Sequence, residues 1–398
     1  MPRLRRRSAA SVATVLAAAA LGSLAGPAVA AAPAATTAEV SPGARVPSVF
    51  RFDGSDPLVT WELPGEPGVS LELTHVATGR TAHLWNYYNA YIRWDGYLDQ
   101  RFGAYNGAYT WTLSTSDGAS TVQTGTTTVQ RAAAPRDFND NGGADALVRD
   151  SAGNLSAYGI QQLVHMKDTE CYEEGCPPVV HDPSGDVLGT GWNTYTLMAS
   201  PSDRTIVGRD RDGVLWLHKG EKQKLLPRTK IGGGWQVYNK ITGGSDLNGD
   251  GRGDLLATDT SGVLWFYAST GDTARPFKPR VKVGGGWQAY NLLVAPGNVA
   301  GATGGDLLAR DEDGVLWMYL GKGDGTFTAR RKVGGGWQKY THVISAGRSS
   351  YGGSTVGVHA IGPAGSAYYS NAGSTTRPFN PAYTLPLRTD STRFKTFF

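Results

Sequence analysis

The chain contains the heptapeptide Lys230-Ile231-Gly232-Gly233-Gly234-Trp235-Gln236, and the same sequence with valine in place of isoleucine returns at 282–288 and 332–338. A tyrosine follows each tryptophan by three residues, and a weaker copy of the pattern lies at Gly191-Trp192. Further out from each heptapeptide, a turn glycine precedes Val-Leu-Trp, and diverged forms of this second motif occur near each end of the repeated region. The chain therefore contains five related units.

The units are spaced by about 50 residues, a period typical of β-propeller blades. In the third unit, short strands are predicted at 254–258, 263–267, 277–283 and 290–295, with Gly, Asp and Pro between them. Four such strands form one blade, and no long stretch has the 3.6-residue apolar period of a helix. We therefore predict an all-β fold in which 137–398 form a β-propeller of about five blades.

The last unit indicates how the ring closes. Its Arg377-Pro378-Phe379 matches Arg275-Pro276-Phe277, so 393–398 take the place where other units have their Trp-to-Tyr strand. The first unit lacks that preceding strand, because a short linker at 132–136 comes before it. We expect the C-terminal strand to complete the first blade, which removes two exposed sheet edges.

The region before the repeats divides into three parts. Residues 1–30 have a basic start, an apolar run and an Ala-Val-Ala site, which together are typical of a secretory signal peptide. Residues 31–47 are expected to be a flexible linker. Residues 48–131 contain alternating segments at 69–73 and 109–113, which predict a small antiparallel β-sandwich.

The signal peptide predicts a secreted, extracellular protein, and no later segment is apolar enough to span a membrane in the mature chain. The chain has 38 Lys+Arg and 34 Asp+Glu. Four of the basic residues lie in the signal peptide, so the mature chain is balanced at 34 against 34. Nucleic acid is therefore not an expected partner. In an oxidising compartment, Cys171 and Cys176 are expected to form a disulfide.

A candidate calcium loop spans Asp246–Asp254. Oxygen-bearing side chains stand at its positions 1, 3, 5 and 9, with glycine at position 6. Ca²⁺ prefers about six to eight oxygen ligands, and a polar turn without an ion is the alternative. The expected ligands are Asp246, Asn248, Asp250, the carbonyl of Arg252, and Asp254.

The first unit has a related loop at 137–145. An asparagine at its position 5 lowers the negative charge available to a cation, so this second site is expected to be weaker or vacant. Its candidate ligands are Asp137, Asn139, Asn141 and Asp145.

The pattern Asp-x-Asn-x-Asp-Gly-x-x-Asp, followed by Leu-Leu-Ala and Gly-Val-Leu-Trp, resembles the FG-GAP/VCBS repeat of integrin α-type propellers over 137–398. This resemblance implies a propeller with calcium in its loops and a role in adhesion or ligand binding. Propellers of that family often have more blades than the five units counted here. The segments 94–96 and 107–111 resemble the FlgD-like immunoglobulin-like domain.

The repeated Gly-Gly-Gly-Trp-Gln motifs have two interpretations. The glycines could let the chain pass close to a neighbouring blade while the tryptophans pack between sheets. Alternatively, the aromatic residues and the glutamines form repeated sugar-binding sites. The candidate ligand-binding residues are Trp235, Tyr238, Trp287, Tyr290, Trp337 and Tyr340, with Gln236, Gln288 and Gln338 beside them.

No catalytic motif stands out. The sequence has no Gly-x-Ser-x-Gly and no His-Glu-x-x-His, and its seven histidines are scattered. We therefore expect a non-catalytic, calcium-binding protein that acts in adhesion, ligand binding or as a scaffold, with an extracellular protein or glycan as its ligand. The alternative is an extracellular glycan-active hydrolase or its inactive remnant, because paired carboxylates can be distant in sequence. The oligomeric state stays open.

Overall fold

The computed structural model describes residues 44–52, 58–61, 68–86, 91–98, 102–115, 118–132, 134, 136–159, 185–348, 356–385 and 394–398. The chain divides into two compact units, Met1–Ser41 and Pro42–Phe398, and all described residues belong to the second. The predicted signal peptide and both cysteines lie outside the described residues. Within the described ranges, no helix is long and apolar enough to cross a membrane.

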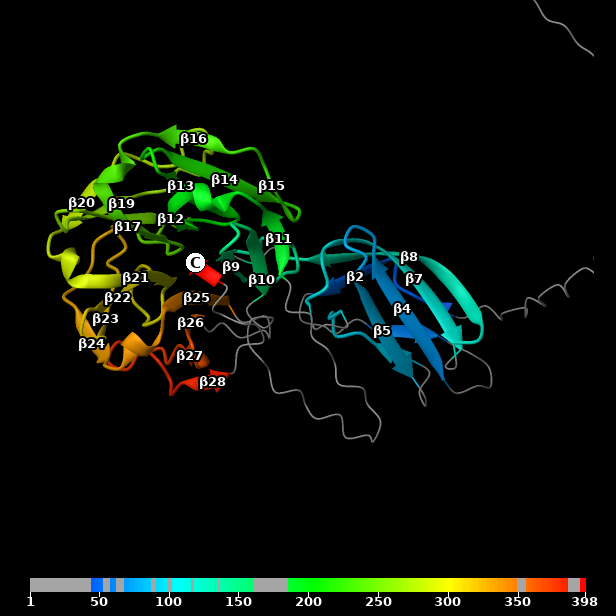
Figure 1. Cartoon of the computed structure of the whole chain (residues 1–398). Helices are drawn as coiled ribbons and strands as arrows, with labels where there is room; N and C mark the ends of the chain where they lie inside the picture. Colours follow the sequence, from blue (N-terminus) through cyan, green and yellow to red (C-terminus); the bar gives the residue numbers. More distant parts are fainter. Residues whose placement is uncertain are drawn as a thin grey trace, which may run out of the picture. The chain divides into compact units, whose positions relative to one another are not determined.

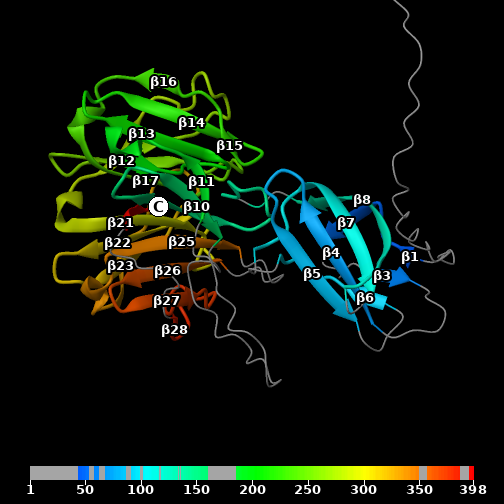
Figure 2. The same cartoon turned by 45° about the vertical axis from the view of Figure 1, so that its right-hand side comes forward.

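Two sheets enclose one apolar core in the N-terminal part of the described chain (Figure 2). The core is centred on fully buried residues such as Trp94 and Tyr109. Alternation along β4, from Val69 to His75, confirms the strand that the sequence predicts there. The larger sheet has the order β2 (Val49–Phe52), β8 (Thr121–Arg131), β7 (Gly107–Thr115), β4 and β5 (Thr81–Asn86), and the smaller has β1 (Ala44–Arg45), β3 (Leu58–Trp61) and β6 (Tyr91–Arg93).

One feature of the larger sheet differs from the antiparallel sandwich that the sequence predicts. Strand β2 pairs with β8 in parallel, with Val49 opposite Thr128. A parallel pair needs a long crossover connection, and here the intervening strands β3 to β7 provide it. The chain therefore enters this sheet along β2 and leaves it along β8 in the same direction.

Five further sheets follow along the chain (Figure 1), and every strand pair in them is antiparallel. Each has four main strands, and the second has an additional two-residue strand, β15 (Lys224–Leu225). In hydrogen-bonded order, the first sheet contains β29 (Phe394–Phe397), β9 (Asp145–Asp150), β10 (Leu155–Gly159) and β11 (Asp186–Gly189), and the second contains β12 (Tyr195–Ala199), β13 (Thr205–Asp210), β14 (Leu215–Glu221) and β16 (Thr229–Gly232). The third sheet contains β17 (Tyr238–Gly243), β18 (Leu255–Asp259), β19 (Leu264–Tyr267) and β20 (Val281–Gly284), and the fourth contains β21 (Tyr290–Gly297), β22 (Asp306–Asp311), β23 (Leu316–Tyr319) and β24 (Arg331–Gly334). The fifth contains β25 (His342–Arg348), β26 (Val356–Gly362), β27 (Gly365–Ser370) and β28 (Tyr383–Leu385).

The grouping of strands corrects the unit predicted from sequence. The strand at 290–295 was expected to be the fourth strand of the third sheet, but β21 pairs with β22 of the fourth sheet, with Tyr290 opposite Asp311. The third sheet begins instead with β17, which follows Trp235. Each Trp-to-Tyr segment therefore opens the sheet that comes after it, because the glycine-rich turn before the tryptophan carries the chain across to the next sheet.

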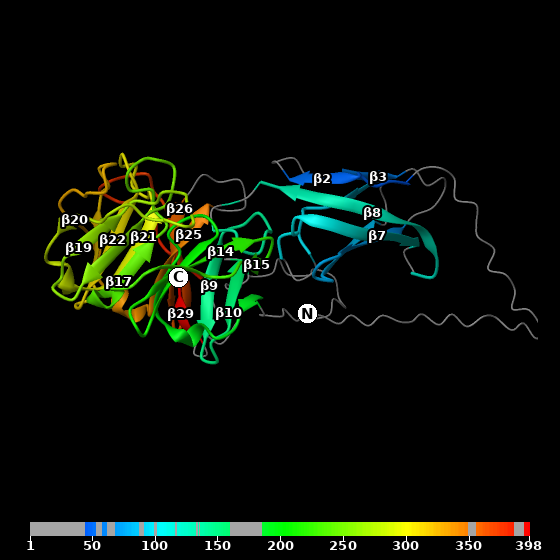
Figure 3. The same cartoon turned by 90° about the horizontal axis from the view of Figure 1, so that it is seen from above.

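The C-terminal strand closes the series as predicted. Strand β29 pairs with β9 (Figure 3), with Phe397 opposite Val148. Phe398 and Leu147 also exchange two backbone hydrogen bonds of 3.0 Å. The first sheet thus contains strands that are more than 240 residues apart in the sequence. Arg149 of β9, for example, donates a side-chain hydrogen bond to Thr396 of β29, which is 247 residues later in the chain.

Apolar clusters fill the spaces between consecutive sheets. One cluster joins the first sheet to the second, and three more join the second to the third, the third to the fourth, and the fourth to the fifth. A fifth cluster contains Ala146 and Tyr158 of the first sheet, Ile344 and Ile361 of the fifth, and both phenylalanines of β29. The first and last sheets therefore share a core, and each sheet packs against two neighbours.

Short 3-10 turns begin four of these sheets. In the third sheet, Gly234 has φ 87° and precedes the turn Trp235–Val237. A residue with a side chain is strained at such a positive φ, so this last glycine of the heptapeptide is required by the backbone. The same geometry precedes Trp192, Trp287 and Trp337.

Candidate functional site

A group of four side chains recurs in the second, third and fourth sheets, and we call it the aromatic module. In the third sheet, the Trp265 indole donates a 2.8 Å hydrogen bond to Asp259, and the Arg280 guanidinium lies 4.0 Å above the indole ring. Arg280 also donates a 2.5 Å hydrogen bond to the hydroxyl of Tyr238. The equivalent modules are Asp210, Trp216, Arg228 and Tyr195 in the second sheet, and Asp311, Trp317, Arg330 and Tyr290 in the fourth.

The carboxylate of each module is ionised at neutral pH. Slight burial raises the pKa of Asp259, but hydrogen bonds from Trp265, Ser261 and Val263 outweigh it and lower the pKa to about 2. The pKa values of Asp210 and Asp311 are lowered in the same way. A fixed negative charge therefore lies at the edge of each indole, with the guanidinium over the ring face.

The tyrosine of each module has a second phenol or imidazole beside it. The Tyr238 and Tyr267 hydroxyls are 2.6 Å apart, as are those of Tyr290 and Tyr319. In the second sheet, His218 takes this place, with Nε2 2.8 Å from the Tyr195 hydroxyl. Burial, and secondarily Arg228, lower the pKa of His218 to about 4, so this imidazole is neutral at pH 7.

The six predicted aromatic ligand residues lie in the packing between sheets. Trp235 is 7% exposed and its ring stacks on Tyr267 of the third sheet, with centroids 4.9 Å apart. The carbonyl of Trp235 accepts a hydrogen bond from Arg209 of the preceding sheet. The other five, Tyr238, Trp287, Tyr290, Trp337 and Tyr340, are also at most 8% exposed. These side chains offer no open ring face in this structure, which matches the packing interpretation of the tryptophans.

Unlike the aromatic side chains, the first two glycines of each heptapeptide are not packed against other parts of the chain. A Cβ atom at Gly232 or Gly233 would have no other atom within 4 Å, and neither residue has a positive φ. The same is true at 284–285 and 334–335. Close passage of the chain therefore does not explain these glycines, contrary to the packing interpretation of the motif. They leave open space beside an exposed stretch of backbone.

The glutamines of the heptapeptides have a structural role. Gln236, Gln288 and Gln338 are exposed, and each covers the turn glycine of the preceding hairpin. A side chain at Gly213, Gly262 or Gly314 would overlap the glutamine above it. The glutamines thus pack on the hairpin turns rather than converge on the open space.

At two of the gaps between sheets, a neighbour of the glycine segment and the module tryptophan pack against the same apolar cluster. Ile231, next to Gly232 on β16, packs in the same cluster as Trp265 of the third sheet. Val283, next to Gly284 on β20, packs in the same cluster as Trp317 of the fourth sheet. In the fifth sheet, the Tyr340 and Tyr369 hydroxyls pair as those of Tyr290 and Tyr319 do, but Ala367 stands two residues before Tyr369, where Trp317 stands before Tyr319. The next sheet therefore has no complete module for the third glycine segment.

The predicted calcium ligands at 246–254 form a hydrogen-bonded turn. Asp246 accepts hydrogen bonds from the backbone N–H groups of Gly249, Asp250 and Gly251 at 2.8–3.1 Å. Asp250 pairs with Arg252 at 2.6 Å, and Asn248 accepts from the Asp250 N–H. The loop's outer turn also lines a cleft of about 170 Å³ together with residues of the second sheet.

The last aspartate of this loop is buried and holds the loop on its sheet. Asp254 accepts hydrogen bonds from the N–H groups of Leu247 and Ser269, and burial raises its pKa to about 6. Asp306 accepts equivalent hydrogen bonds in the fourth sheet, from Val299, Ala300 and Gly321, although its loop keeps an oxygen side chain at only one other ligand position, Asn298. This aspartate therefore has a structural use that does not depend on an ion.

The predicted ligands at 137–145 are more buried. Asp137, Asn139 and Asp145 are at most 1% exposed, and Arg204 forms ion pairs with Asp137 at 3.3 Å and with Asp140 at 2.5 Å. One Asp145 oxygen accepts N–H bonds from Phe138 and Asn139, whereas the other has no partner. Among the described residues of the whole chain, no three His, Cys, Asp or Glu side chains gather closely enough to hold a metal by themselves. A calcium ion at either loop would need amide and carbonyl oxygens as well, including Asn141 in the first loop.

Sequence reasoning did not identify the arginines of the modules, although a signal was present. Arg228, Arg280 and Arg330 each stand two residues before the lysine of a heptapeptide. The aspartates likewise stand six residues before the module tryptophans. An extended repeat alignment would therefore have found both.

Neither a protein-family model nor a curated protein matches this sequence. Solved structures similar to the chain include a lectin from Agrocybe aegerita that recognises non-reducing terminal N-acetylglucosamine, with 16% identity, a TM-score of 0.38, and coverage of 84% of this chain and 85% of the lectin. The BP39L lectin from Burkholderia pseudomallei has 10% identity and a TM-score of 0.37, with coverage of 80% and 95%.

Proposed function

We propose that 137–398 form a five-bladed β-propeller and that this part of a secreted, non-catalytic protein binds glycans at the gaps between blades. The five four-stranded sheets, the five apolar clusters between neighbours and the pairing of β29 with β9 support the architecture. Closure of this kind leaves no long exposed sheet edge. The repeated gaps then lie at equivalent places around the ring.

The observation that carries the binding proposal is the open space at the first two glycines of the heptapeptides. Neither backbone conformation nor neighbouring atoms require glycine at Gly232 and Gly233, yet these residues recur in three units. Because glycine has no side chain, a ligand can approach the backbone closely at these positions. The aromatic module on the facing sheet provides an Arg fork, a carboxylate and phenol hydroxyls, which are groups that bind sugar hydroxyls.

Two complete sites follow from this arrangement. The first combines Gly232 and Gly233 with the module of Trp265 and Arg280, and the second combines 284–285 with the module of Trp317 and Arg330. A narrow site repeated around a ring favours a glycan with repeated end groups over a protein, whose interface normally buries about 800 Å² per partner.

A matched set of glycine variants tests the proposal. Binding partners are first found on a glycan array, and affinity is then measured by calorimetry for Gly233→Val with Gly285→Val. We expect this double variant to lose at least tenfold in affinity with an unchanged melting temperature, because the new Cβ has no atom within 4 Å and the valine methyl groups would occupy the ligand's space. Gly335→Val is the control, since it faces no complete module. An equal loss in the control, or no glycan bound by the parent, would contradict the proposal.

We also propose that the 246–254 loop binds calcium. Its carboxylate, amide and carbonyl oxygens are hard ligands of the type that Ca²⁺ prefers. Asp246, Asn248, Asp250, the Arg252 carbonyl and Asp254 would hold the ion, which would neutralise the loop's carboxylates and rigidify it. Asp250 would then exchange its contact with Arg252 for the ion.

A further inference from the structure

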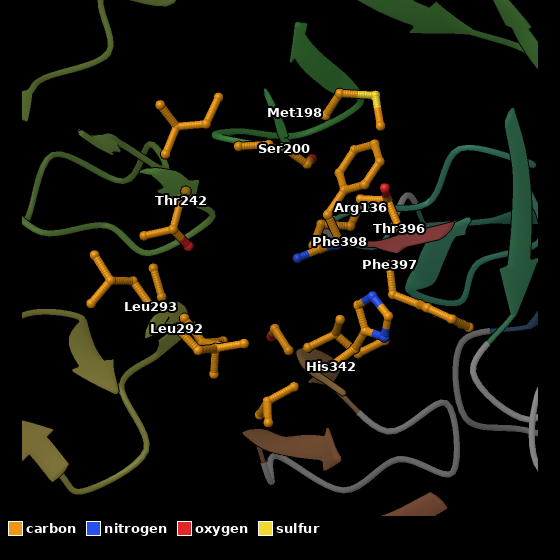
Figure 4. Close-up of a pocket in the computed structure, with 18 residues that line it drawn as sticks. Arg136, Met198, Ser200, Thr242, Leu292, Leu293, His342, Thr396, Phe397 and Phe398 are labelled. Carbon is orange, nitrogen blue, oxygen red and sulfur yellow. The ribbon is translucent and has the colours of Figure 1, made fainter. Parts of the chain in front are cut away.

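A pair of cationic side chains recurs at the outermost strand of three sheets. The exposed pairs are Arg228 with Lys230, Arg280 with Lys282, and Arg330 with Lys332. The strands that carry the lysines, β16, β20 and β24, lie at the periphery of the five sheets (Figure 1). The first strand of each sheet instead lines a central cavity of about 130 Å³ (Figure 4), and among the described residues that line it, none belongs to these pairs. The pairs therefore lie on the outside of the sheets, open to solvent.

Both members of a pair lie on the same face of the sheet as the module tryptophan. Lys282 is directly opposite Trp265 in the pairing of β19 with β20, and directly opposite residues of antiparallel strands project to the same side. Arg280 stands two residues earlier and lies 4.0 Å over the indole ring. Trp265 packs against the apolar cluster between the second and third sheets, so both cations lie on the side that faces this gap. Lys332 is likewise opposite Trp317, at the gap between the third and fourth sheets.

Acidic neighbours on the outer strands do not balance these cations. Strands β19 and β20 contain no Asp or Glu, and neither do β23 and β24. The module contributes one carboxylate, and both oxygens of Asp259 already accept hydrogen bonds, from Val263 and from the Trp265 indole. Within the described chain, no arginine or lysine of the three pairs forms an ion pair. One arginine, one lysine and one aspartate thus leave each module with a net positive charge.

The arginine of each pair is held in place although it is exposed. The Arg280 guanidinium covers one face of the Trp265 ring and donates a 2.5 Å hydrogen bond to the Tyr238 hydroxyl. A guanidinium has five N–H donors, so the others can donate to a ligand, and the side chain is already ordered before binding. Because the guanidinium covers the indole, the chemistry that the module presents to a ligand is that of a cation rather than of an open aromatic ring.

The sheets that lack the module tryptophan also lack both cations. In the first sheet, Ser156 takes the tryptophan position and is opposite Val187, and a glycine stands two residues before this valine. In the fifth sheet, Ala367 is opposite Thr384, and Ala382 takes the arginine position. The fold therefore does not require cations here. An arginine can be lost together with the ring that it covers, but the lysines form no ion pair or cation–π contact with any described residue. Their loss in the same two sheets indicates a shared use in binding.

We propose that the glycans bound at the two complete gaps are acidic, and that the carboxylate of a uronic acid residue binds Arg280 or Arg330 beside the neighbouring lysine. This inference rests on the proposed glycan binding and names the class of ligand. An arginine and a carboxylate form two parallel N–H···O hydrogen bonds, which fixes the orientation of the sugar. The lysine adds a charge that attracts the ligand and that salt screens.

The test compares each acidic oligosaccharide with its own neutral form. Oligomers of galacturonate, glucuronate and mannuronate are each paired with the same oligomer after reduction of the carboxyl groups, and affinity for the full chain is measured by calorimetry. We expect at least one acid to bind at least tenfold more tightly than its reduced form, with a smaller difference at high salt. If every reduced form bound as tightly as its acid, or if no acid bound, the inference would be wrong. Tighter binding of a sulfated oligosaccharide would overturn the assignment to a carboxylate.

Variants then locate the charge recognition. Arg280→Gln with Arg330→Gln should weaken binding of the acid at least tenfold and change binding of the reduced form little. Lys282→Gln with Lys332→Gln, which removes no contact of the fold, should give a smaller loss and a weaker salt dependence.

The control is Arg275→Gln with Arg377→Gln, which removes the same net charge at two exposed positions and should bind like the parent. Gly233→Val with Gly285→Val should weaken the acid and its reduced form alike, so loss of the site is distinguishable from loss of charge recognition. An equal loss for both sugar forms in the arginine variant, at an unchanged melting temperature, or no loss in the lysine variant would overturn the inference and leave the proposed glycan binding standing.

Discussion

Deleting Phe394–Phe398 is the most direct test of how the repeats are held together. This segment supplies the strand that pairs with β9 and two rings in the cluster shared by the first and fifth sheets. Phe394 and Phe397 are each 7% exposed. Truncating a buried phenylalanine to alanine costs about 3–5 kcal/mol, so losing both rings costs on the order of 6–10 kcal/mol. Folded domains have a net stability of about 5–15 kcal/mol.

We therefore expect the shortened chain to unfold at a much lower urea concentration than the full chain, or to lose its cooperative transition. Tryptophan fluorescence is a suitable readout, because Trp192, Trp235, Trp287 and Trp337 lie in the other four clusters. Phe397→Ala gives the graded version, with an expected loss of about 3–5 kcal/mol. Tyr383→Ala, at a side chain that is 62% exposed, should change stability by less than about 0.5 kcal/mol. If the shortened chain unfolded at the same urea concentration as the full chain, β29 would not be a structural part of the first sheet.

Three further predictions concern single residues. Asp250→Ala should lower the melting temperature in calcium and much less in chelator, and equal losses in both would remove calcium from the 246–254 loop. His218→Tyr introduces the residue that the third and fourth sheets have at this place. The folded-state pKa of His218 is about 4, below the ordinary histidine value of 6.5, so the unfolded chain takes up the proton first. The parent should therefore lose stability relative to this variant as the pH falls from 6.5 towards 4. Urea titrations at several pH values would measure this, and parallel pH profiles would refute it. Gly213→Ala should cost more than about 1 kcal/mol, because φ is 75° and the new methyl group would overlap Gln236; Gly233→Ala should be nearly neutral, and the comparison by thermal melting fails if the two variants behave alike.

The sequence was sufficient to predict most of the repeat architecture. The period of the heptapeptide and the match between 377–379 and 275–277 led to the pairing of the last strand with the first sheet. The sequence was less informative about which strands share a sheet. A repeat can be divided at any point along its period, and only the pairing of β21 with β22 shows where one sheet ends.

The candidate sites show a similar limit. A Gly-Gly-Gly-Trp motif contains glycines with different roles, and the letters alone do not separate them. Gly234 is required by its positive φ, whereas Gly233 has open space beside it. The Asp-x-Asn-x-Asp loop likewise satisfies a calcium pattern and a hydrogen-bonded turn with the same atoms. Three-dimensional contacts were needed to tell these roles apart.

The four tryptophan turns have a mechanical consequence. At each of these junctions, the backbone N–H of the tryptophan donates a 2.9 Å hydrogen bond to the carbonyl of the turn glycine in the preceding hairpin, as in Trp235 to Gly213. These four junctions share one contact, whereas the first and fifth sheets are joined through the phenylalanines of β29 and, in the described chain, have no such tryptophan turn. The contact between the first and fifth sheets should therefore separate first when the protein is partly unfolded. Its amide protons should exchange with solvent sooner than those beside the tryptophans.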